Sequence, residues 1–205
     1  MKYLDLHDSF KNFTVFSVDE IKKIDAKFHR RRLNEWQDKG YIQKVIKGFY
    51  IFSDLDINER TLFEIANKIH RPSYVSLETA LSYYQLIPES VYAVTSITSR
   101  RPAHYKTPQA DFIYRNIKPA LFFGYDLVEH LGKRLKIASV EKALLDYLYL
   151  NPHLSSADSF ASLRIDAPVF QQRFDENKMA SFLARISQKR LARRVDIFLE
   201  FMKNA

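Results

Sequence analysis

The sequence predicts an α+β protein made of two parts. Between residues 16 and 52, two short helical patterns are followed by two β-rich runs that flank Lys47-Gly48. From residue 57 onward, helical and strand-like segments alternate, and the chain ends in helical patterns. Two helices followed by a β-hairpin are typical of a winged helix-turn-helix, a module that usually binds DNA. We therefore expect an N-terminal winged helix-turn-helix (residues 1–56) followed by a mixed α/β domain (57–205) that ends in helices.

Length and composition are compatible with this division. A chain of 205 residues can bury two modest cores. Lys and Arg outnumber Asp and Glu by 32 to 24, and the formal charge of +8 favours a polyanionic partner. The sequence has no cysteine, which excludes disulfides and thiolate metal sites. No apolar run approaches the ~18 residues of a membrane span, and Asp5 and Asp8 interrupt the place of a signal peptide. We expect a cytoplasmic protein without a membrane partner.

The first two helices are predicted from spacing and capping. Apolar residues at helical intervals predict a helix over residues 3–12. Ser17 and Glu20 have the spacing of a capping box, in which each side chain binds a backbone N–H at the helix start. A second helix is therefore expected from Val18 to about Asp25.

A third helix and a hairpin complete the predicted DNA-binding unit. The third helix is expected over 27–39, with Gly40 ending it, because glycine adopts a left-handed conformation at little cost. Residues 41–46 and 49–52 are rich in β-branched and aromatic side chains, and Gly48 suits the tight turn between them. This hairpin is the predicted wing.

The third helix has one apolar face and one basic face. At 100° per residue, Leu33 and Trp36 point to the core, with His29 one turn earlier on the same side. A groove-entering helix needs donors for phosphates and base edges on its other face. A charged face that is only solvated is the competing interpretation, and the flanking cap, glycine and hairpin argue against it. The predicted DNA-binding residues of this helix and the hairpin are Lys27, Arg30, Arg31, Arg32, Asn34, Lys44 and Lys47.

The larger domain is predicted to combine helices and strands after a polar linker at 54–58. Helices are expected at 59–70, 76–86 and from Ser139 to about 150, each with a polar residue at its start. The chain is expected to be helical again from about Pro168 to Lys203. Strands are expected at Val91–Thr98, Phe112–Ile117, Ala120–Leu127 and Arg134–Ile137.

Basic residues of the larger domain form a possible second phosphate-binding surface. They lie in the loop after the first predicted strand and along the last helical region, where i, i+4 and i+8 positions align on one face. A solvated face is the alternative, and a break at Ser187-Gln188 would scatter the row. The residues of this surface are Arg100, Arg101, Arg185, Lys189, Arg190, Arg193 and Arg194.

The sequence shows no pattern typical of an enzyme. Its four glycines form neither a P-loop nor a dinucleotide-binding fingerprint, and its histidines show no metal-ligand spacing. Glu141 and Asp146 are five residues apart on a predicted helix and therefore face different directions. We expect no catalytic residue, no metal and no cofactor.

Three stretches resemble the AbiEi-type abortive-infection antitoxins, the transcriptional regulators of type IV toxin–antitoxin systems. They are the hairpin ending in Lys-Gly-Phe-Tyr, the run Tyr74-Val-Ser-Leu-Glu-Thr-Ala-Leu-Ser-Tyr-Tyr-Gln-Leu-Ile-Pro, and Ile137-Ala-Ser-Val-Glu-Lys-Ala-Leu-Leu-Asp-Tyr-Leu. The resemblance covers most of residues 15–150. It implies a repressor that binds double-stranded DNA at its own promoter, often at inverted repeats. It also implies a nucleotidyltransferase-like toxin as functional partner, countered without a stable complex.

Two other functions remain open from the sequence. The larger domain could hold a toxin or another protein, with DNA binding secondary. The protein could also be an enzyme of nucleic-acid metabolism that uses the winged unit for docking. Co-purification with the product of the neighbouring gene would favour the first alternative, and metal-dependent turnover would favour the second.

Overall fold

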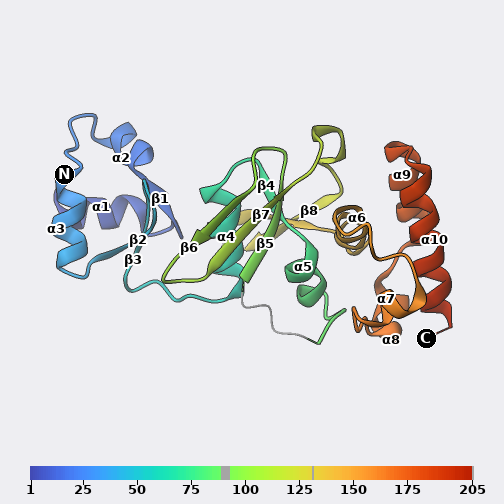
Figure 1. Ribbon diagram of the computed structural model, residues 1–205. Coiled ribbons are helices and arrows are strands. Elements are labelled where there is room, and N and C mark those ends of the chain that lie inside the picture. The colour runs from blue at the N-terminus through green and yellow to red at the C-terminus, as the bar shows by residue number, and fades with distance from the viewer. Residues whose placement is uncertain (89–92, 131, 205) are drawn as a thin grey trace.

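The computed structural model describes residues 1–88, 93–130 and 132–204. Its elements follow one another along the molecule: N-terminal helices at one end, a six-stranded sheet in the middle and C-terminal helices at the other end (Figure 1). The two chain ends therefore lie far apart. Helices combined with a mixed sheet confirm the predicted α+β class.

Residues 1–56, here called the N-terminal unit, form a small helical cluster on a three-stranded antiparallel sheet of order β1-β3-β2. A separate core of aromatic and aliphatic side chains, including Leu6, Phe16 and Trp36, holds it together. The predicted first helix is two residues too long, because the chain turns after Phe10 and the Phe13 N–H donates a hydrogen bond to the Phe10 carbonyl (2.8 Å). The elements are α1 (Tyr3–Phe10), β1 (Phe16–Ser17), α2 (Val18–Ile24), α3 (Arg31–Asp38), β2 (Ile42–Ile46) and β3 (Phe49–Phe52).

Residues 57–204, here called the larger unit, are built on a mixed sheet of order β6-β7-β5-β4-β9-β8. Strand β4 lies at its centre, antiparallel to β5 and parallel to β9. The outer pairs β6–β7 and β8–β9 are antiparallel, and β5–β7 is parallel. The strands are β4 (Ser73–Val75), β5 (Ala93–Thr98), β6 (Ala103–Lys106), β7 (Asp111–Asn116), β8 (Tyr125–His130) and β9 (Lys133–Ala138).

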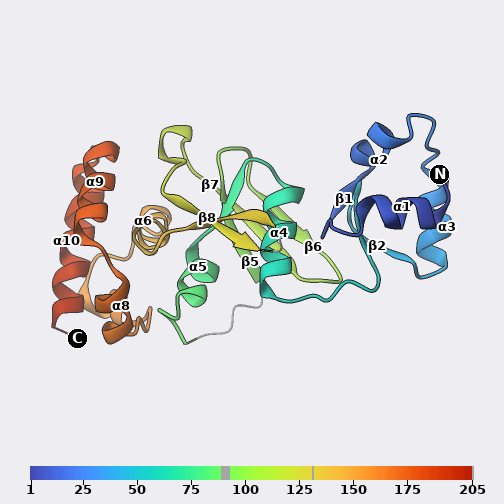
Figure 2. The same ribbon diagram turned by 180° about the vertical axis from the view of Figure 1, so that it is seen from behind.

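Three helices pack against this sheet. Helix α4 (Glu59–Ile69) contacts β4, β5 and β9 and lies in front of the sheet in Figure 2. Helices α5 (Leu77–Tyr83) and α6 (Val140–Leu150) pack against each other, with α5 against β5 and α6 against β9. Asn58 and Ser139 cap α4 and α6, as polar residues at predicted helix starts should.

Two strands of the sheet were not predicted. Strand β4 has three residues and β6 has four, and both are too short to show a clear period in the sequence. The predicted strand Ala120–Leu127 is wrong in its first half. Pro119–Leu121 forms a 3-10 turn instead, closed by Leu121 N–H to the Lys118 carbonyl (2.8 Å), and the strand begins only at Tyr125. Residues 91 and 92 of the first predicted strand lie outside the described residues.

The C-terminal end is a group of separate helices rather than one helical run. Ser187 adopts a left-handed conformation (φ 52°) and ends the helix before it. The sequence allowed a break at Ser187-Gln188 as an alternative, and the structure contains it. The apolar stripe of Leu191, Val195, Phe198 and Met202 is buried, as its spacing predicts. The helices are α7 (Ala157–Ala161), α8 (Ala167–Arg173), α9 (Glu176–Ile186) and α10 (Lys189–Lys203).

Among the described residues, no helix has both the length and the apolar character that crossing a bilayer requires.

Candidate nucleic-acid interface

Helix α2 begins with the predicted capping box. Ser17 Oγ accepts a hydrogen bond from the Glu20 backbone N–H (3.2 Å), and the Glu20 carboxylate accepts one from the Ser17 N–H (2.8 Å). Both bonds satisfy amides that a helix start leaves unpaired. The start of α2 is therefore determined by local sequence.

Helix α3 begins at Arg31, four residues later than predicted. The Asp25 carboxylate accepts the Lys27 N–H (3.1 Å), and the Phe28 N–H donates to the Asp25 carbonyl (3.0 Å), so the chain turns before it becomes helical. The turn places Phe28 in the core, with its ring centroid 5.7 Å from that of Trp36, and leaves His29 exposed. The prediction of a buried His29 is therefore wrong, because the neighbouring aromatic ring occupies the site.

The outward face of α3 carries donors at its N-terminal end. Leu33 and Trp36 are buried, as predicted. Arg31 lies 3.9 Å from Glu35 in an exposed pair, which holds it only weakly. Because helix N-termini carry partial positive charge, the side chains and the helix favour the same anionic partner. The exposed donors at this end are Lys27, Arg30, Arg31 and Asn34.

Arg32, one of the predicted DNA-binding residues, also makes a contact within the chain that was not predicted. Its guanidinium donates a hydrogen bond to the Met1 carbonyl, while the Met1 ammonium pairs with Asp25 at 3.0 Å. Arg32 and Asp25 therefore attach the chain start to α3 and to the end of α2. This contact links residues 31 positions apart, and local spacing gives no signal for it.

The hairpin consists of β2 and β3, joined by a two-residue turn, Lys47-Gly48. Gly48 has φ +90°, a conformation that favours glycine, and Ile46 pairs with Phe49 on either side of the turn. Lys44 and Lys47 are exposed, as predicted. Gly40 also has a positive φ (+71°) and follows the end of α3. The Tyr41 N–H donates a hydrogen bond to the Trp36 carbonyl (2.9 Å).

The hairpin also joins the two units. Tyr50 and Phe52 belong to the core of the N-terminal unit, whereas Val45 and Ile51 belong to the core of the larger unit. Gln43 Oε1 accepts a hydrogen bond from Gln109 Nε2 (2.9 Å) in the turn between β6 and β7. Solvent therefore reaches the hairpin mainly near its turn and its exposed edge, where Lys47 and Lys44 lie.

A cleft of about 500 Å³ lies where the N-terminal unit meets α4 and β9. Two ion pairs cross it or line it: Lys68–Glu20 at 2.9 Å and Lys133–Glu64 at 2.7 Å. Burial raises the pKa of Glu20, but the Lys68 ammonium and the Ser17 donors outweigh burial and leave this pKa below its ordinary value. Burial lowers the pKa of Lys68.

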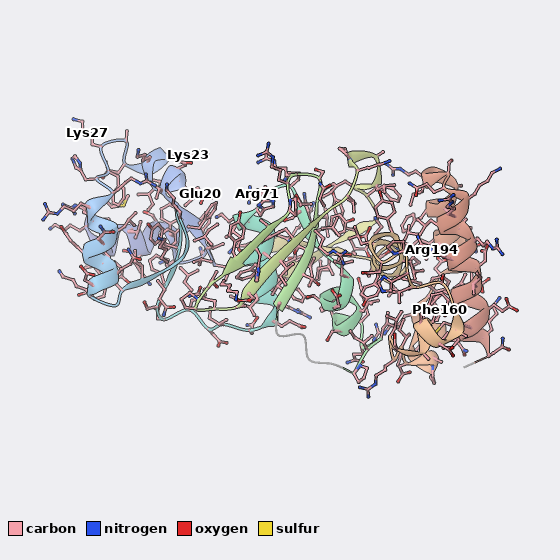
Figure 3. All side chains as sticks on the ribbon, viewed as in Figure 1. Glu20, Lys23, Lys27, Arg71, Phe160 and Arg194 are labelled. Atoms are coloured by element: carbon pink, nitrogen blue, oxygen red, sulfur yellow. The ribbon has the colours of Figure 1, made fainter. Side chains whose placement is uncertain are left out.

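Two basic side chains outside the predicted set, Lys23 and Arg71, lie along one edge of the molecule together with the predicted Lys27. Lys23 on α2, Lys27 in the following turn and Arg71 after α4 are found along the upper edge in Figure 3. The Lys22-Lys23 pair at the end of α2 could have indicated this in the sequence. Arg71 could not, because it belongs to the larger unit and only the fold brings it to this edge.

The second predicted basic surface is divided by the fold. Arg100 and Arg101 follow β5 and are exposed, far in sequence from the other members. Arg185 ends α9 with its guanidinium 4.0 Å from the centre of the Phe123 ring. The break at Ser187 separates it from Lys189, so the predicted i, i+4, i+8 row does not exist. Arg190, Arg193 and Arg194 remain together on α10.

Two of the stretches that carry the family resemblance meet inside the larger unit. The Asp146 carboxylate accepts hydrogen bonds from Tyr74 Oη (2.8 Å), Ser76 Oγ (2.9 Å) and the Lys142 ammonium. The side chains of Lys142 and Asp146 are 1% and 2% exposed. Burial raises the pKa of Asp146, against the opposing effect of Lys142. A group so enclosed cannot reach a substrate, and we interpret it as structural.

The structure also explains two helix starts near this group. Ser76 precedes α5 but makes no capping hydrogen bond, because its hydroxyl is directed to Asp146. Ser139 caps α6 and donates to Glu141, which also accepts the Asp175 N–H (3.0 Å) at the start of α9. Glu141 and Asp146 thus bind different partners, in agreement with the prediction that their side chains face different directions.

Among residues 1–88, 93–130 and 132–204, no three His, Asp or Glu side chains gather as a metal site would require. Comparison of the sequence with models of known protein families gives no match, and a search of curated proteins gives none.

Proposed function

We propose that this protein is a DNA-binding transcriptional repressor that acts as the antitoxin of a type IV toxin–antitoxin system. The observation that carries the DNA-binding part is the order α1-β1-α2-α3-β2-β3, with β1 paired to β3. This order and pairing suit a winged helix-turn-helix, with α3 as recognition helix and the hairpin as wing.

The exposed charges support the same assignment. Lys27, Arg30 and Arg31 lie around the start of α3, and Lys44 and Lys47 lie on the hairpin. Such side chains bind phosphate oxygens, and Arg31 and Asn34 can also hydrogen-bond to base edges. A net charge of +8 strengthens the attraction to DNA over a longer range.

The biological role in the proposal rests on the resemblance to the AbiEi-type antitoxins. On that basis the protein binds inverted repeats in its own promoter, in the cytoplasm, and autoregulates its operon. It counters a nucleotidyltransferase-like toxin without forming a stable complex. The proposal includes no catalysis and no cofactor.

An electrophoretic mobility shift series with DNA from the region upstream of the gene tests the DNA-binding part. The logarithm of affinity should fall linearly with the logarithm of salt, and each lost phosphate contact should reduce the slope by about 0.9. Arg30→Ala, Arg31→Ala and Lys47→Ala should each weaken binding in this way. Lys118→Ala is the matched control, because Lys118 is exposed after β7, at the end away from the hairpin.

Unchanged affinity and slope in all three variants would refute the proposed surface. The antitoxin role has a separate test, in which the protein is co-expressed with the product of the adjacent gene. Growth rescue without co-purification is expected. Co-purification of the two proteins would instead favour a protein-interaction module.

A further inference from the structure

A hollow of about 470 Å³ lies between α10 and the chain segment that follows α6. One wall is formed by Arg190, Arg193, Arg194 and Ile197 of α10, and the other by Pro152 and Ser155. Figure 3 places Arg194 between α6 and α10. The volume of the hollow is within the range of small-molecule sites, roughly 300–1,000 Å³.

The helix spacing explains why these side chains meet. Residues i, i+3, i+4 and i+7 share one face of a helix, so Arg190, Arg193, Arg194 and Ile197 form a single strip. This strip flanks the buried stripe that begins at Leu191. Arg194 and Ile197 are therefore half-buried, while Arg190 and Arg193 are exposed.

The described residues that line the hollow supply no counter-charge for this strip. Within the described part of the chain, no acidic side chain lines the hollow and its three arginines form no ion pair. By contrast, Lys142, Lys68 and Lys133 each pair with a carboxylate.

Arg194 is the least exposed of the three arginines. Burial lowers the pKa of its guanidinium, and Nη1 donates a long hydrogen bond to the Asn151 carbonyl (3.5 Å). Like charges at i, i+3 and i+4 also destabilise a helix. A bound anion would relieve both effects.

We infer that this hollow binds the phosphate group of a phosphorylated ligand. Guanidinium groups bind phosphate through paired, charge-assisted hydrogen bonds, and three of them line one wall of the hollow. Pro152 and Ile197 add apolar surface beside the anion site, where the remainder of the ligand would pack. The phosphate could come from a free nucleotide or from a nucleic-acid backbone, since both present the same group.

Isothermal titration calorimetry of the full chain with sodium pyrophosphate at low salt tests the inference. Saturable binding is expected, and Arg190→Gln and Arg193→Gln should each weaken it about tenfold, as loss of one charge-assisted bond predicts. Lys189→Gln is the matched control, because it removes the same charge from an exposed position on α10 that does not line the hollow. It should leave the affinity within about twofold of the parent protein.

Competition identifies the source of the phosphate. Displacement of pyrophosphate by AMP or ATP alone indicates a free nucleotide, and displacement by a short DNA of unrelated sequence alone indicates a backbone. Arg194→Lys keeps the charge but loses the guanidinium fork, and should also weaken binding. No saturable binding, or an equal loss in Lys189→Gln and the arginine variants, would overturn the inference. Since the arginine substitutions lie on α10 and leave α3 and the hairpin unchanged, their effect on pyrophosphate binding is independent of the proposed repressor function.

Discussion

Asp146→Asn should destabilise the larger unit far more than an ordinary surface substitution. The variant keeps an oxygen that can accept from Tyr74 and Ser76, but it removes the negative charge beside the Lys142 ammonium. With Lys142 only 1% exposed, water cannot replace the lost partner. The experiment therefore isolates the cost of a buried charge without a counter-charge.

The magnitude follows from this enclosure. Removing one partner of a buried ion pair costs about 3–5 kcal/mol, which is a large share of the roughly 5–15 kcal/mol that stabilises a typical domain. Replacing both charged groups with neutral ones should cost much less. The double variant Lys142→Met with Asp146→Asn is expected to recover to within about 2 kcal/mol of the parent protein.

Urea unfolding followed by far-ultraviolet circular dichroism measures these changes, and the two single variants with the double variant complete a double-mutant cycle. Asp126→Asn is the matched control. Its carboxylate is exposed and 4.0 Å from Lys178, so its loss should cost less than about 1 kcal/mol. A cost below about 1 kcal/mol for Asp146→Asn would refute the reasoning. Strict additivity in the cycle would do the same, because it would show that the two charges are not coupled.

Two further predictions concern the N-terminal unit. Glu20→Gln should lower stability by about 1 kcal/mol at neutral pH, because it removes the charge paired with Lys68 and keeps the capping geometry. Since the pKa of Glu20 is held below its ordinary value of about 4.5, this stabilisation is complete above that value and is lost as pH falls through the lowered pKa. Thermal unfolding between pH 7 and pH 3 should therefore show the two proteins converging in acid, and a constant difference would contradict the assignment. Arg32→Gln should leave the salt slope of DNA binding unchanged and increase amide hydrogen exchange in α1, because Arg32 holds the Met1 carbonyl. A slope reduced by about 0.9 would instead return Arg32 to the DNA-contacting set.

Features that depend on neighbouring residues were predictable from sequence. The capping box of Ser17 and Glu20, the glycines at 40 and 48, and the hairpin between β2 and β3 all appear where expected. Each depends on contacts within a few residues, so spacing and residue type are sufficient to predict it.

Features that depend on distant partners were not predictable in this way. The contact of Arg32 depends on Met1, 31 positions away in the chain. Strand β4 is defined by the neighbours on either side, β5 and β9, rather than by its own three residues. In the candidate interface, the sequence therefore predicted the exposed donors around α3. It did not predict that Arg71 and Lys23 lie along the same edge of the molecule.

The α+β class, the helix caps, the hairpin and the basic character of the α3 start can be predicted from the sequence alone, because each is encoded in local periodicity, capping or charge. Which charges remain available depends on the tertiary fold. The fold buried Lys142 against Asp146, tied Arg32 to Met1, separated Arg185 from α10 and placed Pro152 and Ser155 opposite the arginines of α10. The physical reason is that a side chain's charge is local, whereas its exposure and its partner are set by residues far away in the chain.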